Sequence, residues 1–440
     1  MNKPLVAVVG RPNVGKSTFF NKIAGSRISI VKDLPGVTRD RLYADAEWCG
    51  YNFTLIDTGG IGLSKEDEFT NHIKQQAQIA IESAAVILFI VDGKDGLMVE
   101  DYAVADILRT TKKPVILAVN KLDNFDISLT YEFYNLGLGE PFAISAEQGK
   151  GLGDLLDEVV KKLPKQDESE QDDSLKIAVV GKPNVGKSSL VNKILGYKRV
   201  IVSDVAGTTR DAIDTPFTLN GQDYTIIDTA GMRKKKAIDG ETVESYSVMR
   251  SILAIKRADI VLIVIDATEP LSEQDIKIAG LVHEEGKPSL IVINKWDCIT
   301  KDTFTIEKFE QALKIDLKFM DYFKSIYVSA LTGQRVEKII EITNLVYENA
   351  SKRITTSTLN DIIGEAVSLN EPPSKNGRKL KIYYATQSSV CPPKFILFVN
   401  DNELVHFSYK RYLENCLRRS VDFAGTPIQL QFNNKKKDED

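Results

Sequence analysis

The 440-residue chain contains one long segment twice, and this duplication constrains its fold more than any other feature. The stretch KPLVAVVGRPNVGKSTFFNKIAG, which begins at Lys3, returns as LKIAVVGKPNVGKSSLVNKILG from Leu175, so that Gly10 and Gly181 lie 171 residues apart. Solenoid repeats have periods of about 20–50 residues. The much longer period found here therefore indicates a duplicated domain, and the chain holds two related domains followed by a further segment.

Two changes in the sequence pattern predict the domain boundaries. The segment KQDESEQDDS has five acidic residues and no apolar one, so it cannot bury enough surface to offset the entropy lost on ordering. After residue 352 a shorter helix–strand–strand–helix–strand pattern replaces the repeated one. The predicted segments are 1–164 for the first repeated domain, 165–174 for a flexible acidic linker, 175–351 for the second repeated domain, 352–432 for a small α+β domain and 433–440 for a charged tail.

Each copy alternates short Val- and Ile-rich runs with helical patterns, which predicts βαβ units and an α/β fold with a mostly parallel sheet flanked by helices. The dipeptide Asn220-Gly221 is typical of a hairpin turn, so we expect one antiparallel edge strand in each sheet. The predicted strands of the first copy are Leu5–Val9, Phe53–Ile56, Val86–Val91, Val115–Val119 and Phe142–Ile144, and those of the second are Lys176–Val180, Tyr224–Ile227, Ile260–Ile265, Ser289–Ile293 and Ile326–Val328. The small domain is predicted to contain helices Leu359–Ser368 and Leu404–Arg418 and strands Lys379–Ala385, Phe395–Val399 and Ile428–Phe432.

Composition favours a cytoplasmic protein. The longest apolar run, Ala84–Val91, is far shorter than the ~20 residues of a membrane-spanning helix, and the N-terminus carries no signal-peptide pattern. Four scattered cysteines form no C-x-x-C pair, and three histidines share no metal-ligand spacing, which indicates reduced thiols and argues against zinc. The net charge of −4 divides into +4 for residues 352–432 and −8 before residue 352, which leaves a nucleic-acid partner open.

Both copies carry the phosphate-binding pattern G-x-x-x-x-G-K-S/T between a predicted strand and a predicted helix. Its glycines let backbone N–H groups close around phosphates, and the helix N-terminus adds its positive dipole. Lys16 and Lys187 are expected to reach the β and γ phosphates, and the hydroxyls of Ser17 and Ser188 to bind Mg²⁺. Two copies in the right context make a chance match negligible.

A second repeated motif, D-T-G/A-G, follows an apolar strand in each copy. Asp57 and Asp228 can hold Mg²⁺ through its water shell, and the N–H groups of Gly60 and Gly231 can meet the γ-phosphate.

The third motif, N-K-x-D, indicates which base of the nucleotide is bound. It closes a strand in each copy, at the edge where open parallel sheets bind ligands. Asp123 and Asp297 can accept from guanine N1–H and N2–H, whereas adenine would leave the carboxylate unpaired. Asn120 and Asn294 can reach N7, and the later Ser-Ala pair would place a backbone N–H near O6.

Together the motifs predict two GTP sites that hydrolyse GTP to GDP and phosphate with Mg²⁺. The predicted residues of the first site are Gly10, Arg11, Pro12, Asn13, Val14, Gly15, Lys16, Ser17, Asp57, Thr58, Gly59, Gly60, Ile61, Asn120, Lys121, Leu122, Asp123, Ser145 and Ala146. Those of the second site are Gly181, Lys182, Pro183, Asn184, Val185, Gly186, Lys187, Ser188, Asp228, Thr229, Ala230, Gly231, Met232, Asn294, Lys295, Trp296, Asp297, Ser329 and Ala330.

These motifs resemble those of the translation-factor-related GTPases, and two such domains before a small α+β domain are similar to the double-Era-like GTPase family, Der or EngA. The stretches KIYYATQ (381–387) and FILFVNDNELVHFSYKRYLEN (395–415) resemble its KH-like domain. The resemblance covers essentially the whole chain. It implies a role in assembling the large (50S) ribosomal subunit, with rRNA as a partner and the nucleotide state setting the arrangement of the domains. We also expect a monomer.

The resemblance further identifies Gly36–Asp40 and Gly207–Asp211 as switch I segments, in which Thr38 and Thr209 would close on Mg²⁺. The implied catalytic residues are Lys16, Thr38, Gly60, Lys187, Thr209 and Gly231.

Ile61 and Met232 stand where many GTPases carry a glutamine that positions water, so hydrolysis should be slow or assisted. Related GTPases use a potassium ion held partly by a phosphate-loop Asn, which Asn13 and Asn184 match; a structural turn is the alternative.

Several functional alternatives stay open. The segment after the second motif is acidic in the first copy (62–68) and basic in the second (233–236); the basic run reports the nucleotide state to RNA or is a solvated loop. One GTPase domain could bind nucleotide with little turnover. A tRNA-modification or membrane-linked GTPase is disfavoured because the sequence carries no amphipathic anchor, lipidation motif or added enzyme domain.

The small domain has no G-x-x-G in residues 352–440, which argues against ordinary KH-type RNA clamping. Its interleaved aromatic and basic side chains form either an RNA platform or core packing and a docking surface. They are Tyr383, Tyr384, Tyr409, Lys410, Arg411 and Tyr412. For Trp296, within the N-K-x-D motif, we expect packing against the sheet.

Overall fold

The computed structural model describes residues 4–25, 43–57, 84–123, 127–164, 174–197, 200–202, 214–227, 251–300, 302–372, 374–375 and 377–434. No helix in these ranges is long and apolar enough to cross a membrane. The chain divides into two compact units, Met1–Gln171 and Asp172–Asp440, and the second contains both the second copy and the small C-terminal domain. The predicted acidic linker, apart from Ser174, lies outside the described residues, and the finer domain boundaries stay a prediction.

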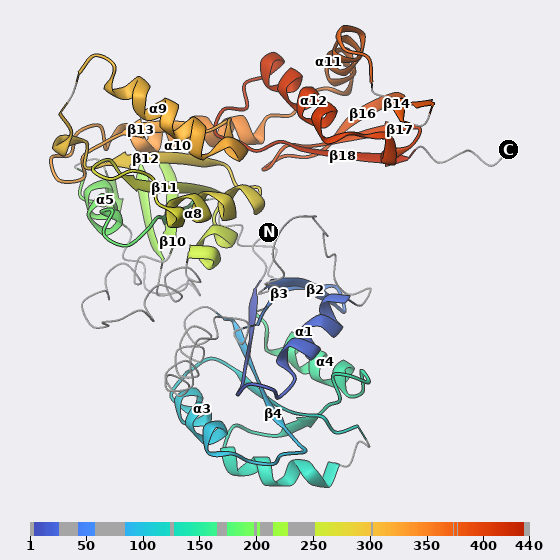
Figure 1. Ribbon diagram of the computed structural model, residues 1–440. Helices are drawn as coiled ribbons and strands as arrows, with labels where there is room; N and C mark the ends of the chain where they lie inside the picture. Colours follow the sequence, from blue (N-terminus) through green and yellow to red (C-terminus); the bar gives the residue numbers. More distant parts are fainter. Residues whose placement is uncertain are drawn as a thin grey trace. The chain divides into compact units, whose positions relative to one another are not determined.

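The first unit is built on a six-stranded sheet with the order β2-β3-β1-β4-β5-β6 (Figure 1). Its strands are β1 (Leu5–Val9), β2 (Tyr43–Trp48), β3 (Tyr51–Asp57), β4 (Val86–Asp92), β5 (Val115–Asn120) and β6 (Pro141–Ala143). All neighbouring pairs are parallel except β2 with β3, which confirms the antiparallel edge strand. The last strand begins and ends one residue before the predicted Phe142–Ile144, because Pro141 already pairs with Leu117.

Helices cover both faces of this sheet because its strands alternate side chains between two buried cores. Val6 and Val8 pack with α1 (Lys16–Gly25) and α4 (Leu152–Lys162). Ala7 and Val9 pack on the opposite face, with α3 (Val99–Arg109) and η3 (Ile127–Leu136). Burial on both faces explains the nearly continuous apolar runs in the sequence. This is the predicted α/β architecture.

The second unit repeats the plan with a seven-stranded sheet in the order β13-β12-β11-β7-β10-β9-β8. Its strands are β7 (Leu175–Val180), β8 (Val200–Val202), β9 (Thr215–Leu219), β10 (Gln222–Ile227), β11 (Ile260–Asp266), β12 (Ser289–Asn294) and β13 (Lys324–Tyr327). Asn220 and Gly221 have φ angles of 53° and 81°, as a type I′ hairpin between β9 and β10 requires. The expectation of one extra edge strand was incomplete, because β8 pairs antiparallel with β9 and takes the edge.

The helices of this domain again lie over two cores. The strands contribute alternate side chains to a core with α5 (Lys187–Leu195) and α10 (Lys338–Ser351). The other core contains residues of 251–258 and of α8 (Glu273–Glu284), η4 (Trp296–Cys298), α9 (Thr305–Asp316) and η5 (Lys318–Met320).

The C-terminal domain is the predicted small α+β unit, with a sheet in the order β16-β17-β18 and helices α11 and α12 on one face (Figure 1). Its elements are α11 (Thr356–Leu369), β14 (Ser374–Lys375), β15 (Arg378–Lys379), β16 (Ile382–Ser389), β17 (Lys394–Val399), η6 (Asn402–Leu404), α12 (Phe407–Ser420) and β18 (Gln429–Asn434). The predicted helix Leu404–Arg418 was wrong at its start. His406 caps α12 by accepting from Ser408 N–H, so the helix begins only at Phe407.

A loop of the C-terminal domain hydrogen-bonds directly to the second GTPase-like domain. The Ser289 N–H, at the start of β12, donates to Gly425 O at 2.8 Å, and the Gly425 N–H donates to Tyr322 O at 2.7 Å. Gly425 has φ +77°, and a Cβ atom there would lie 2.7 Å from Val346. Only glycine fits this close approach. The C-terminal domain is therefore joined to the second copy through backbone hydrogen bonds.

Candidate functional site

The phosphate loops lie where β1 passes into α1 and β7 into α5, and each requires glycine at two positions. Gly10 has φ +154°, and a Cβ atom there would lie 2.2 Å from Ile90 O; at Gly15, with φ +92°, it would lie 2.3 Å from Asn120 Nδ2. The second copy reproduces both distances to within 0.1 Å at Gly181 and Gly186. The loop is thus pressed against the ends of the central strands, and the two copies share one geometry.

Asn120 of the N-K-x-D motif holds three motifs together. Its Nδ2 donates to Val14 O at 2.8 Å and its Oδ1 accepts from Ala146 N–H at 2.9 Å. The side chain is buried, and Asn294 makes the same two bonds at the same lengths. An amide nitrogen has two hydrogens, so one of them is used here and the predicted contact with guanine N7 depends on the other.

The Ser-Ala pair uses its own backbone donors inside the protein. The Ser145 N–H donates to Lys150 O at 3.0 Å, and the Ala146 N–H donates to Asn120. A bound guanine O6 would have to share the second of these donors. The predicted contact with O6 therefore stays a prediction.

Lys16 is the buried cation of the first phosphate loop. Its Nζ donates to Gly10 O and Arg11 O, both at 2.7 Å, and the residue is 6% exposed. Burial lowers the pKa of Lys16 to about 8. Lys187 donates to the equivalent carbonyls of Gly181 and Lys182 at 2.5 and 2.6 Å. Each ammonium group lies at the loop that is predicted to surround the phosphates.

Two predicted Mg²⁺ ligands of the first site lie together. The Ser17 hydroxyl donates to Asp57 Oδ2 at 3.0 Å. A hydroxyl that binds Mg²⁺ through its oxygen keeps its hydrogen for a neighbouring acceptor, so Ser17 could bind the ion directly while Asp57 holds it through its water shell. In the second copy Ser188 is described, whereas Asp228 lies outside the described residues.

The two predicted base sites differ in charge. Asp123 accepts from the Ser145 hydroxyl at 2.8 Å and pairs with Lys94 at 2.6 Å. The Lys94 ammonium and the Ser145 hydroxyl hold the pKa of Asp123 below its usual range. Thr268 stands at the position of Lys94 in the second copy, where it binds Asp266 instead. Sequence reasoning missed Lys94, because the repeat could not reveal a residue that only one copy has.

The two middle residues of each N-K-x-D motif have different surroundings: the lysine is partly exposed, and the residue after it is buried. Lys121 and Lys295 have left-handed φ angles of 68° and 61°, and each Nζ pairs at 2.5 Å with the aspartate that ends the neighbouring strand. Leu122 and Trp296 are each 2% exposed, so their side chains belong to the core. Trp296 contacts Phe309 and Tyr327, which confirms the expected packing.

The sequence did not reveal that the residue after the first glycine of each phosphate loop, Arg11 or Lys182, contacts two carboxylates. Arg11 lies 2.9 Å from Asp95 and 3.5 Å from Asp101, which is buried in the first turn of α3. The second copy has Lys182 with Glu269 at 2.6 Å and Asp275 at 3.6 Å. Matching charge types at matching repeat positions were the signal that could have revealed this contact.

The two asparagines that match the potassium-linked residue lie in the phosphate loops. Asn13 and Asn184 have left-handed φ angles of 64° and 65°, and both are exposed. A further set of predicted site residues lies outside the described part of the chain. They are Thr38, Thr58, Gly59, Gly60, Ile61, Thr209, Asp228, Thr229, Ala230, Gly231 and Met232, together with both switch I segments and the charged runs 62–68 and 233–236.

The aromatic residues of the C-terminal domain divide into two groups. Tyr409 and Tyr412 pack against α11 and donate to Asn370 O at 3.0 Å and to Ala366 O at 2.9 Å. Tyr383 and Tyr384 are 51% and 44% exposed. The RNA platform considered for all four tyrosines is thus reduced to the latter two.

Comparison with known proteins agrees with this geometry. Residues 5–121 and 176–295 match a family described as a 50S ribosome-binding GTPase, and residues 353–433 match the C-terminal KH-domain-like family of EngA bacterial GTPase enzymes. A protein named GTPase Der from Alkaliphilus oremlandii is 56% identical over 437 residues, which are 99% of each chain. Another GTPase Der, from Agathobacter rectalis, is 54% identical over 444 residues and 100% of both chains.

Proposed function

The chain belongs to the GTPase Der family and is a GTP hydrolase, and from this premise we propose that it is a nucleotide-dependent switch in assembly of the large ribosomal subunit. The observation that supports the partner is the match of both repeated domains to a family described as binding the 50S ribosome. The net charge of +4 in residues 352–432 and the exposed Tyr383 and Tyr384 suit rRNA as the contacted component. The place of action would be the cytoplasm.

In each site the phosphate loop would bind the β and γ phosphates through its backbone N–H groups. Lys16 and Lys187 would exchange their loop carbonyls for phosphate oxygens and so place a positive charge against the transferring group. Ser17 and Asp57 would hold Mg²⁺, which supplies charge neutralisation at the phosphates when bound. Thr38 and Thr209 would complete the metal sites.

Guanine recognition would rest on Asp123 and Asp297, which would accept from N1–H and N2–H. Asn120 and Asn294 act as positioning residues, because each ties the base-binding motif to the phosphate loop. In the first site Asp123 would bind guanine while also facing Lys94, a cation that the second site replaces with Thr268. This difference between the copies supports the alternative in which one domain binds nucleotide with little turnover.

Asn13 and Asn184 would each offer a side-chain oxygen to a potassium ion, as their exposed left-handed turns allow. The ion would supply the positive charge that an arginine finger would otherwise give, at sites where Ile61 and Met232 cannot orient water.

Co-sedimentation tests the assembly role. The chain should pellet with large ribosomal subunits more strongly with a non-hydrolysable GTP analogue than with GDP. Binding that does not depend on the nucleotide would reject the switch. Lys16→Ala and Lys187→Ala, measured separately for GTP turnover, would show whether one domain supplies most of the hydrolysis.

A further inference from the structure

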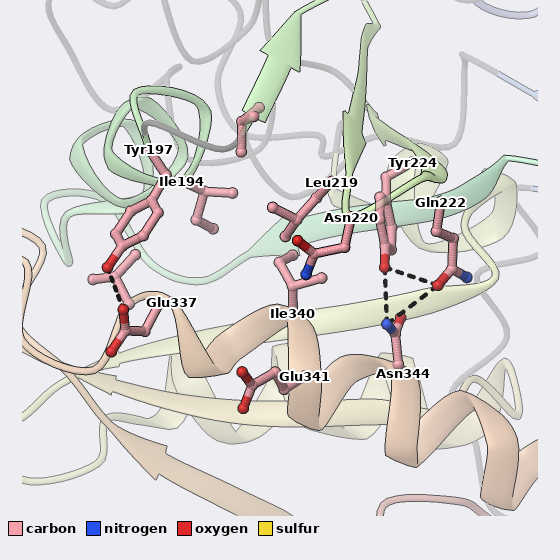
Figure 2. A pocket seen from close by; sticks show the side chains of 12 residues that line it. Ile194, Tyr197, Leu219, Asn220, Gln222, Tyr224, Glu337, Ile340, Glu341 and Asn344 are labelled. Atoms are coloured by element: carbon pink, nitrogen blue, oxygen red, sulfur yellow. Dashed lines mark hydrogen bonds between the residues drawn. The ribbon is translucent and has the colours of Figure 1, made fainter.

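The second GTPase domain contains a pocket of about 180 Å³ between α5, the β9–β10 hairpin and α10 (Figure 2). It lies away from the phosphate loop and the N-K-x-D motif, so the nucleotide does not account for it. Its apolar wall includes Ile194, Leu219 and Ile340. An engineered cavity of about 150 Å³ in another protein accepts benzene, so this pocket has room for a small aromatic ring.

The polar rim of the pocket includes the side chains of Asn344 and Glu341 as acceptors, beside the amide groups of Asn220 and Gln222. Asn344 Oδ1 is buried and accepts no hydrogen bond from the described residues. Its Nδ2 donates to the Tyr224 hydroxyl at 2.8 Å. Glu341 also lines the pocket, and Figure 2 shows it below Ile340 with no hydrogen bond to the other residues drawn, whereas Glu337 binds Tyr197. A ligand that fits would therefore present an apolar ring with an N–H donor.

In the first copy, the indole ring of Trp48 occupies the position that corresponds to this pocket. Trp48 ends β2 before the Cys49-Gly50 turn, just as Leu219 ends β9 before Asn220-Gly221. The Trp48 indole donates from Nε1 to Asp157 Oδ1 at 2.6 Å. Asp157 lies twelve residues after the serine of its Ser-Ala pair, and Glu341 lies twelve residues after Ser329.

A second residue difference between the copies accompanies the one between Trp48 and Leu219. In copy one Gly153 faces the ring, since a Cβ atom there would lie 3.8 Å from Trp48 Cζ2. The equivalent residue in copy two is Glu337, which binds Tyr197 and forms a wall of the pocket. The second copy thus has no indole at this position, but it has a carboxylate at the position that receives the indole N–H in the first copy.

We propose that this pocket binds an indole ring, with the Glu341 carboxylate accepting the ring N–H and the aliphatic wall covering its faces. The ring comes either from a free indole-type molecule or from a tryptophan side chain of another chain. One chain would bind one ring, because Trp48 fills the equivalent space in the first copy.

Titration of the full-length chain with indole, in saturating GDP, tests the proposal by calorimetry or saturation-transfer NMR. One saturable site is expected. 1-Methylindole, which lacks the donor, should bind about tenfold more weakly, equivalent to ~1.4 kcal/mol. Glu341→Ala should weaken indole by a similar factor and leave 1-methylindole unchanged. The matched control is Asp157→Ala, which should leave the site intact.

Two exchanges between the copies provide a second test that does not rely on Glu341. Leu219→Trp should fill the pocket and abolish binding, whereas Trp48→Leu should open the first copy and raise the stoichiometry to two indoles. Equal affinity for indole and 1-methylindole, or full binding to Leu219→Trp, would overturn the proposal. Because binding is measured directly, these results do not depend on GTP hydrolysis or ribosome binding.

N-acetyltryptophanamide distinguishes the two sources of the ring. Binding of both probes at this site supports a tryptophan side chain, and binding of indole alone supports a free small molecule. Failure of both probes would contradict the inference.

Discussion

Replacing Asn120 by alanine is the perturbation whose effect follows most directly from the structure. The side chain is 2% exposed and makes one bond to Val14 O at 2.8 Å and one from Ala146 N–H at 2.9 Å. A buried group left without its partner costs about 1–3 kcal/mol. Asn120→Ala leaves two such groups, so we expect a loss of roughly 2–6 kcal/mol, shared between the stability of the first unit and its nucleotide affinity.

A titration of the full-length chain with a fluorescent GDP analogue can measure the affinities of the two sites separately. The wild type should show two sites, and Asn120→Ala should weaken one of them by about 30-fold when ~2 kcal/mol of the loss falls on affinity. Asn294→Ala should weaken the other site by a similar factor, since its hydrogen bonds have the same lengths. Asn294→Ala therefore tests the same prediction independently in the second copy.

Asn360 provides a control for lost hydrogen bonds away from both sites. It exchanges two bonds with the backbone of Ala385, at 2.8 and 2.9 Å. Asn360→Ala should lower the unfolding free energy of the C-terminal domain and leave both nucleotide sites unchanged. If Asn120→Ala kept two normal sites while losing as much stability as Asn360→Ala, the asparagine would have no role in positioning the site, and our reasoning would be refuted.

Three further predictions concern charge at the two sites. Asp123→Asn and Asp297→Asn should each cost about 3 kcal/mol, or roughly 100-fold, in GTP affinity at the altered site and shift it towards xanthine nucleotides; unchanged GTP affinity in both variants would remove the base assignment. Hydrolysis should be clearly faster in KCl than in NaCl at equal ionic strength, and equal rates would exclude a potassium role for Asn13 and Asn184. Burial lowers the pKa of Lys16 from 10.5 to about 8, so the unfolded state binds more protons between these values and the unfolding free energy should rise with pH across that window, by about 3 kcal/mol in total. Lys16→Met should flatten this rise in urea unfolding, and an unaltered pH profile would contradict the assignment.

The strands and motifs could be predicted from the sequence because their signals are local. Each of the ten predicted strands of the two copies corresponds to an observed one, since buried parallel strands are short apolar runs. Element ends were less accurate. The cap formed by His406 delays α12, and the predicted strand Lys379–Ala385 is instead divided between β15 and β16.

The positions of the site motifs were predictable, whereas their contacts were not. Lys94 and Asp123 are 29 residues apart, and Arg11 and Asp95 are 84 residues apart. These pairs meet because parallel strands bring their carboxyl ends to one edge, which fixes proximity but not which charges face each other. The pocket of the second copy was equally hidden, because it arises from the absence of a tryptophan rather than from any motif.

The hydrogen bond between Ser289 and Gly425 has a mechanical consequence. It joins the C-terminal domain to the first residue of β12, and the last residue of the same strand is Asn294, which binds the phosphate loop. A strand of this length spans only about 20 Å. A force that pulls the C-terminal domain away therefore loads the strand that ends at the second base site. In single-molecule stretching, bound guanine nucleotide should raise the force at which this contact breaks.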